Sequence, residues 1–197
     1  MHWHDEMELM FVQSGCCTVT LNKVPFTVHT GDIVPILPGM LHAIEQLHEE
    51  TCEYFSILFD LKMLGQDSPS DYCYTTYIKP YLDEQISLPF RIPSNHPQHD
   101  RISEILTSLT QTISESPHGY ELIVKSQLYR IFWLFESLEG RTLQAPPDHS
   151  QLTQIKKIKE LLLFIHSNYA SPLSLKGAAD FCGYSVSYFT KFFKSFT

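Results

Sequence analysis

The chain has 197 residues, 43% of them hydrophobic, which is enough for one or two domains with cores of their own. No stretch is as long and apolar as a membrane span, and the first residues lack the pattern of a signal peptide. The five cysteines contain no C-x-x-C pair, so neither a disulfide framework nor a thiolate metal cluster is indicated. We therefore expect a soluble, cytoplasmic protein without a membrane partner.

The formal net charge of -8 is unevenly distributed along the chain. Residues 1–140 contain 7 Lys and Arg against 19 Asp and Glu, whereas residues 141–197 contain 7 against 3. An acidic body joined to a basic tail fits a protein that holds nucleic acid only through its C-terminal part. Small helical domains are also often mildly basic without binding nucleic acid, so the charge alone does not decide between these interpretations.

Residues 2–59 alternate in polarity or form short apolar runs, as strands do. Gly15, Asn22, Gly31 and Pro38-Gly39 interrupt these runs at the spacing expected of a small antiparallel β-barrel or sandwich. The expected strands cover residues 8–12, 17–21, 26–29, 33–37, 42–44 and 54–59.

Four potential metal ligands lie in this β-rich region. His2 and His4 alternate on an expected strand and Glu8 shares their face by parity, so all three side chains are expected to face the barrel interior. His42, on a neighbouring strand, completes a set of three histidines and one carboxylate suited to Fe, Mn, Ni, Zn or Cu. The same groups can instead hydrogen-bond an organic ligand or one another.

Two phrases in this region resemble the two motifs of the cupin superfamily. They are His2-x-His4-x-x-x-Glu8 with Gly15 after it, and Gly31 followed by Pro38-Gly39-x-x-His42. The resemblance implies a cupin-type antiparallel β-barrel over residues 1–95, with the three histidines and the glutamate as its ligand-binding residues. It leaves open a divalent transition metal held by the same four residues, and with it a metal-dependent enzyme such as an isomerase or dioxygenase.

Residues 62–78 form a polar, tyrosine-rich stretch in which 67–71 are expected to be a surface loop, and an edge strand that contains Pro89 is expected over 86–92. His96 and His99, which flank Pro97, are expected to be solvated turn residues. Helices over 100–114 and 120–138 then form an antiparallel hairpin. The second helix is apolar on more than one side, so it needs a further partner unless the barrel and loops of the same chain cover it.

A linker is expected over residues 141–150, where Pro146-Pro147 stiffens the chain and excludes a continuous helix. A long helix over 152–168 follows it. Ser174 can cap a short helix that ends at Gly183, and Ser185 can cap a second helix that runs to residue 196. Two helices joined by a tight glycine turn are the helix-turn-helix signature.

The last of these helices has two unlike faces. One is an apolar stripe of phenylalanines, and the other carries hydroxyls and ammonium groups at positions i, i+3, i+4 and i+7. Such a polar face suits a recognition helix in the major groove, although the solvated face of any amphipathic helix has the same pattern. The stripe is Phe189, Phe192, Phe193 and Phe196, and the polar face is Ser187, Thr190, Lys191 and Lys194.

The stretch 173–194 resembles the first half of the DNA-binding domain of AraC/XylS-type transcription regulators. The matching positions are Ser185, Tyr188, Phe189, Lys191, Phe193 and Lys194. With the cupin-like motifs before it, the resemblance covers nearly the whole chain. It implies a regulator, not an enzyme, whose barrel binds a small effector such as a sugar. It also implies a homodimer formed through the hairpin of residues 96–140, and promoter DNA bound through the polar face of residues 187–194.

We therefore predict an α+β fold with a sensor barrel over 1–95, a dimerisation hairpin over 96–140, a linker over 141–150 and a partial three-helix DNA-binding unit over 151–197. No cofactor is expected beyond the divalent metal left open above. Members of the family continue into a second helix-turn-helix, so we expect this chain to be truncated. A truncated chain could also be a DNA-silent dimerisation module, which is the third interpretation.

Overall fold

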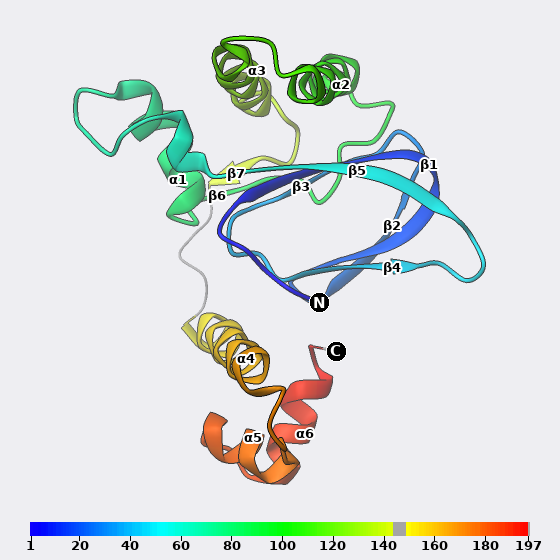
Figure 1. Ribbon diagram of the computed structural model, residues 1–197, viewed down its shortest axis with the longest axis vertical. Coiled ribbons are helices and arrows are strands. Elements are labelled where there is room, and N and C mark those ends of the chain that lie inside the picture. Colours follow the sequence, from blue (N-terminus) through cyan, green and yellow to red (C-terminus); the bar gives the residue numbers. More distant parts are fainter. Residues whose placement is uncertain (144–148, 197) are drawn as a thin grey trace. The chain divides into compact units, whose positions relative to one another are not determined.

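The computed structural model describes residues 1–143 and 149–196. The chain divides into two compact units, His2–Pro146 and Pro147–Thr197, which we call the barrel unit and the helical unit. Antiparallel strands fill the first part of the barrel unit and helices follow them, which confirms the predicted α+β fold class (Figure 1).

Five antiparallel strands form the barrel: β1 (Met7–Leu21), β2 (Val24–His29), β3 (Ile33–Ile36), β4 (His42–Gln46) and β5 (Cys52–Phe59). The long strand β1 pairs with all four others, since its first half lies between β3 and β5 and its second half between β2 and β4. The prediction of two separate strands over 8–12 and 17–21 is therefore wrong. One bent strand joins the two sheets of the barrel (Figure 1).

The bend in β1 is centred on Gly15, whose φ is +76°. The pairing of β1 with β5 shifts by one position between Val12 and Ser14, which is a β-bulge. A Cβ atom on Gly15 would lie 1.7 Å from the backbone oxygen of Thr51, so no side chain fits there. The glycine bends the strand and does not end it, because β2 and β4 continue the hydrogen bonding that β3 and β5 begin.

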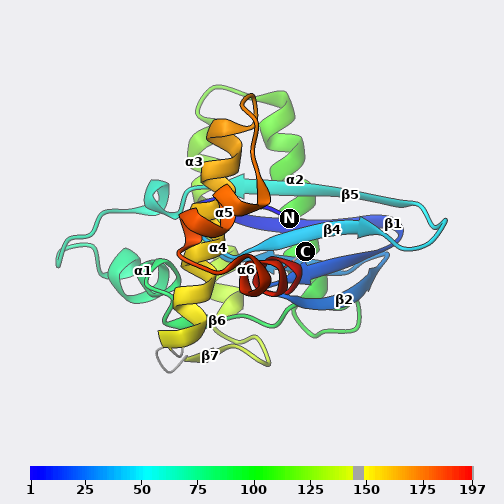
Figure 2. The same ribbon diagram turned by 90° about the horizontal axis from the view of Figure 1, so that it is seen from below.

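Side chains of β1 alternate between two hydrophobic cores. Met7 and Leu9 belong to a core that also contains buried residues of α2 (His99–Glu115) and α3 (Tyr120–Phe135). Met10 and Val12 belong to a second core with side chains of β2 and β3, which fills the barrel. The helices α2 and α3 lie side by side over the face formed by β1, β3 and β5 (Figures 1 and 2).

The segment between β5 and α2 is more helical than predicted. It contains a 3-10 turn η1 (Leu61–Leu64), a π-helical turn η2 (Tyr74–Ile78) and α1 (Lys79–Leu82), while residues 67–71 lie outside any helix or strand, as expected of a loop. The strand expected over 86–92 is only β6 (Ile86–Ser87), paired with β7 (Thr142–Leu143), because Pro89 cannot donate to a ladder.

The helical unit contains α4 (His149–Asn168), α5 (Leu175–Cys182) and α6 (Val186–Lys194). Their common core is small and includes Ile158, Leu161, Ala179, Cys182, Phe189, Phe192 and Phe196. Of the predicted linker, residues 144–148 lie outside the described residues, and its last two residues already belong to α4. Across the described residues, no helix combines the length and apolarity that a membrane crossing requires.

Candidate functional site

The first candidate site is a cluster of polar side chains in the barrel unit, formed by His2, His4, Glu8 and His42, which we call the histidine cluster. Residues 1–6 form no strand, so the prediction that His2 and His4 alternate on one is wrong. The backbone of His2 instead exchanges two hydrogen bonds of 2.9 Å with His42 at the start of β4, and the carbonyl of His4 accepts one from Gly39. These bonds bring the first residues against the turn before β4.

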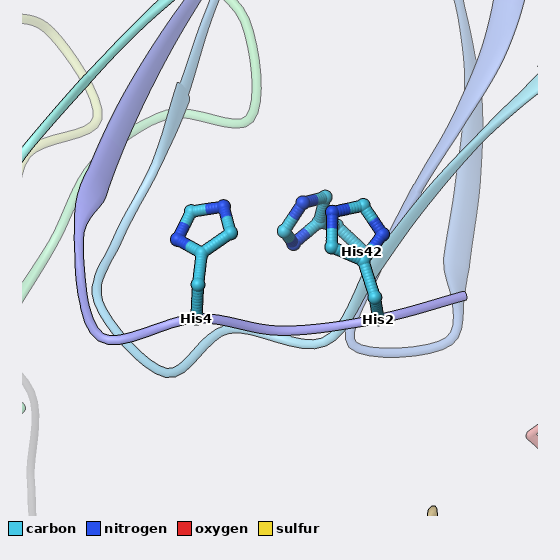
Figure 3. Close-up of side chains that lie close together, drawn as sticks. All are labelled: His2, His4 and His42. Atoms are coloured by element: carbon cyan, nitrogen blue, oxygen red, sulfur yellow. The ribbon is translucent and has the colours of Figure 1, made fainter. Parts of the chain in front are cut away.

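The three imidazole rings converge (Figure 3). Each ring offers a nitrogen, and these three nitrogens lie within 4.8 Å of one another. The ring centroids of His2 and His42 are 4.1 Å apart, and those of His4 and His42 are 5.0 Å apart. His42 is buried, His4 is half-buried and His2 is exposed, so the cluster is open to solvent on the side of His2.

Glu8 lies beside two of these rings. It is the first inward-facing residue of β1, and its Oε2 atom is 3.1 Å from Nε2 of His4 and 3.4 Å from Nε2 of His42. Burial alone would raise the pKa of Glu8, but the polar groups of His42, Ser56 and His4 around it outweigh burial and lower the pKa to about 2. Glu8 is therefore a carboxylate at neutral pH.

The ring of His2, on the open side of the cluster, favours the neutral form. The pKa of His2 is lowered, first by its partial burial and then by the charges that His42 and His4 would carry if protonated. A neutral imidazole has one ring nitrogen with a free lone pair, which can accept a hydrogen bond or coordinate a metal.

Two buried polar atoms of this region have no hydrogen-bond partner: Nε2 of His42 and Oγ of Ser56. An unsatisfied buried polar atom costs about 1–3 kcal/mol, so its presence is informative. Ser56 was not predicted as a site residue. Nothing in the sequence distinguishes it, because Tyr54 carries a second hydroxyl on the same face of β5.

The other histidines lie elsewhere. His99 is buried at the start of α2 and lies 2.6 Å from the carbonyl oxygen of Gly31 through Nε2, so the prediction that it is a solvated turn residue is wrong. It joins α2 to the turn between β2 and β3 and has a structural role. His96 is half-buried in the turn before α2.

The cysteines form no disulfide in the structure, and all five are free. Cys17 is buried in the barrel core, and this burial, together with Cys52 and Cys16, raises the pKa of its thiol to about 12. Such a thiol stays protonated at neutral pH and is unsuited to act as a nucleophile or metal ligand.

The second candidate site is the polar face of α6. Ser174 and Ser185 accept hydrogen bonds from the backbone N–H groups of Gly177 and Tyr188, which confirms both predicted N-caps. Gly183 ends α5 in the left-handed conformation with φ of +72°, as predicted. Ser195 ends α6 one residue before Phe196, so this helix is shorter than expected.

The two faces of α6 differ as the sequence predicted. Phe189, Phe192 and Phe196 are buried, while Phe193 is only half-buried. On the other face Ser187, Lys191 and Lys194 are exposed. Thr190 is half-buried and its hydroxyl donates to the carbonyl of Val186, so it projects less than the other three. The structure thus presents a hydroxyl and two ammonium groups on one capped helix.

Comparisons with known proteins agree with this arrangement. The family profile described as AraC-like ligand binding domain matches residues 1–132. An uncharacterized HTH-type transcriptional regulator, YdeC of Bacillus subtilis strain 168, is 26% identical over 195 residues. The match covers 98% of this chain but 64% of YdeC, so the chain spans less than two thirds of that relative.

Similar solved structures include two proteins. The AraC-like transcriptional activator CuxR is 10% identical with a TM-score of 0.48, and the match covers 97% of this chain and 61% of CuxR. ToxT from Vibrio cholerae is 12% identical with a TM-score of 0.49, and the match covers 99% of this chain and 87% of ToxT.

Proposed function

The chain belongs to the AraC-type transcription regulators, and on that premise we propose that it senses a small metabolite in its barrel and binds promoter DNA through α6. The observation that carries the DNA-binding part is the exposed face of α6, where Ser187, Lys191 and Lys194 lie opposite a buried row of phenylalanines. Hydroxyl and ammonium groups of this length reach base edges and phosphates in a major groove. A promoter-binding regulator of this kind acts in the cytoplasm.

The effector site of this proposal is the histidine cluster with Ser56 beside it. Two buried atoms there have no hydrogen-bond partner. Nε2 of His42 can accept a hydrogen bond, and the hydroxyl of Ser56 can both donate and accept one. Hydroxyl groups of a sugar or a similar metabolite satisfy both kinds of atom. The effector would act through its different affinities for two arrangements of the regulator.

We also propose that the regulator is a homodimer formed through α3. Leu122 and Trp133 are three helical turns apart on one face of α3, and they are 77% and 59% exposed. Beside Trp133 lies a cavity of about 480 Å³, which Tyr77, Tyr129 and Phe132 help to line. Two exposed apolar side chains, one of them next to an apolar cavity, fit a second copy of the helix, since a side chain of the partner can enter the cavity.

The regulator is proposed in preference to a metal-dependent cupin enzyme. The comparisons name transcription regulators, and the basic face of α6 has a use in a regulator that an isomerase or dioxygenase lacks. A DNA-silent dimerisation module is distinguished from the regulator by the binding experiment that follows.

The test is DNA binding by the 197-residue chain. DNA sequences selected from a random pool would be titrated with the chain and with Lys191→Ala, followed by fluorescence anisotropy. We expect Lys191→Ala to weaken specific binding by about 1–3 kcal/mol, or about 5- to 150-fold. The matched control is Lys62→Ala, which removes the same charge from an exposed position on η1. If the two variants bound DNA with equal affinity, Lys191 would not belong to the DNA interface. If no DNA sequence could be selected from the pool, the DNA-silent dimerisation module would be the better interpretation.

The dimer is tested by sedimentation equilibrium. Because Leu122 would lie between the two copies, Leu122→Glu is expected to weaken the dimer about tenfold or more, or about 1.4 kcal/mol. Leu163→Glu places the same charge on α4, at a leucine that is 56% exposed. A monomeric parent chain, or equal weakening by both variants, would contradict the proposed interface.

A further inference from the structure

The cavity beside Trp133 is walled mainly by aromatic rings, and we call it the aromatic cavity. It lies between η2 and α3 within the barrel unit, and Tyr77, Tyr129, Phe132 and Trp133 line it. Its volume of about 480 Å³ is within the range of small-molecule sites, about 300–1,000 Å³. Tyr77 and Trp133 are 38% and 59% exposed, so a small molecule can reach the cavity from solvent.

Two of the four rings are held in place by contacts outside the cavity. The hydroxyl of Tyr129 donates a hydrogen bond to the carbonyl oxygen of Leu64. Phe132 is buried, and its ring meets the ring of Tyr81 edge to face with 5.2 Å between the centroids. Side chains that are ordered before a ligand arrives lose little conformational freedom when it binds.

The charge around the cavity is negative. Among the described residues that line it, Glu136 is the only charged one, and no Lys or Arg is among them. Arg141 donates to one of the two oxygens of Glu136, Oε1, at 2.8 Å, and a carboxylate can accept further hydrogen bonds. Asp71 adds to the field, since the pKa of Tyr129 is raised first by burial and then by the charge of Asp71. The surroundings therefore favour a positive ligand.

The ring of Trp133 already attracts a cation in this structure. The guanidinium carbon of Arg101 lies 5.0 Å from the centroid of that ring, within the distance of about 6 Å over which the π electrons attract a positive charge. Arg101 does not line the cavity, so the cavity meets a part of the ring that Arg101 leaves open. Clustered aromatic faces are the surroundings in which proteins bind quaternary ammonium groups.

We propose that the aromatic cavity binds a small organic cation, with its ammonium group near Glu136 and Trp133 and its apolar part against the remaining rings. A neutral apolar ligand would cover the charge of Glu136 without compensating it, which is costly. An anion would be repelled by the same carboxylate. A bound cation also excludes the partner side chain that the proposed dimer places in this cavity, so the cation should favour the monomer. Only this last consequence rests on the proposed function.

The experiment is isothermal titration calorimetry on the full chain carrying Leu122→Glu, which keeps a partner out of the cavity. Three compounds with the same aromatic ring are compared: benzyltrimethylammonium, benzyl alcohol and phenylacetate, which are positive, neutral and negative. We expect one benzyltrimethylammonium ion to bind per chain, about tenfold or more tightly than either of the other two.

Two further variants in the same background locate the site. Glu136→Gln removes the negative charge and keeps an oxygen that can accept from Arg141, and we expect it to weaken binding of the cation about tenfold. Trp133→Leu removes the ring but keeps an apolar side chain, and should weaken it about fivefold. The matched control is Glu121→Gln, which removes the same charge from an exposed position in the first turn of α3 and should change nothing.

Three results would overturn the inference: no saturable binding of benzyltrimethylammonium, equal affinities for the three compounds, or equal affinities in Glu136→Gln and Glu121→Gln. In the parent chain, sedimentation equilibrium should show a weaker dimer with benzyltrimethylammonium than with phenylacetate, and an unchanged dimer would overturn the exclusion of the partner. The calorimetry uses neither DNA nor a dimer. A failure of cation binding therefore leaves the proposed regulator to its own tests, and their failure leaves the cation site standing.

Discussion

The two candidate sites lie in opposite surroundings. The histidine cluster includes two buried side chains, Glu8 from the first half of β1 and His42 from β4, which pairs with the second half of β1. The polar face of α6 is exposed, and the helix that carries it is held by an N-cap and a row of phenylalanines on the other side. In the barrel, the side chains that would bind a ligand also contribute to the stability of the fold. On α6, binding would belong to the exposed residues and stability to the N-cap and the phenylalanines.

This difference predicts how substitutions should act. A change near the histidine cluster should alter stability and binding together, because the same buried atoms serve both. A change on the exposed face of α6 should alter binding and leave stability nearly unchanged. The two tryptophans of the chain, Trp3 and Trp133, both lie in the barrel unit, so tryptophan fluorescence follows the unfolding of that unit alone. Circular dichroism follows the helices of both units.

The largest expected effect is at the bend of β1. Gly15→Ala would place a Cβ atom 1.7 Å from the backbone oxygen of Thr51, and the left-handed φ adds strain. We expect the barrel unit to lose about 4 kcal/mol or more of its free energy of unfolding, a loss at the upper end of single substitutions. Urea unfolding followed by tryptophan fluorescence measures this loss.

The control for this variant is another glycine with the same backbone conformation. Gly119 has φ of +81° between α2 and α3, and a Cβ atom there would meet nothing within 4 Å. Gly119→Ala should therefore cost only the conformational strain, about 1–2 kcal/mol. If the two variants lost equal stability, the contact with Thr51 would not be what requires glycine at position 15.

Local signals in the sequence predicted the helical unit well. Ser174, Gly183 and Ser185 were expected to begin and end helices because their side chains or backbone conformations act within a few residues, and the structure confirms all three. The buried and exposed faces of α6 follow from the same short-range periodicity. Two boundaries differ: α4 begins at His149, before the expected residue 152, and α6 ends before Ser195.

The barrel was predicted less completely, because its geometry depends on contacts between distant residues. Gly15 looks like the end of a strand, and only the pairing of β1 with four partners shows that it is a bend. His99 looks like a loop residue, but the carbonyl it meets is 68 positions away in the chain. The four residues of the histidine cluster were correctly grouped for a partly wrong reason, since a backbone bridge to His42 and not a strand brings His2 there.

The smallest expected effect concerns two serines at the start of α6 that are two positions apart. The same substitution at each of them separates a residue that stabilises the helix from one that would bind DNA. Ser185 accepts a hydrogen bond from the N–H of Tyr188, so Ser185→Ala should cost about 1 kcal/mol of the stability of the helical unit. Ser187 is exposed within the helix, where alanine is the better helix former, so Ser187→Ala should leave stability equal or slightly raised.

The two variants should also differ in DNA affinity, but here Ser187→Ala should show the larger loss. Ser187→Ala removes a hydroxyl from the proposed contact face, while Ser185→Ala leaves every side chain of that face in place. Circular dichroism during urea unfolding measures the stability of the helices, and tryptophan fluorescence should be unchanged in both variants because α6 lies in the helical unit. If Ser187→Ala lost both stability and DNA affinity, the prediction would be contradicted. Binding and stability would then depend on the same residues in α6, as we expect only for the barrel.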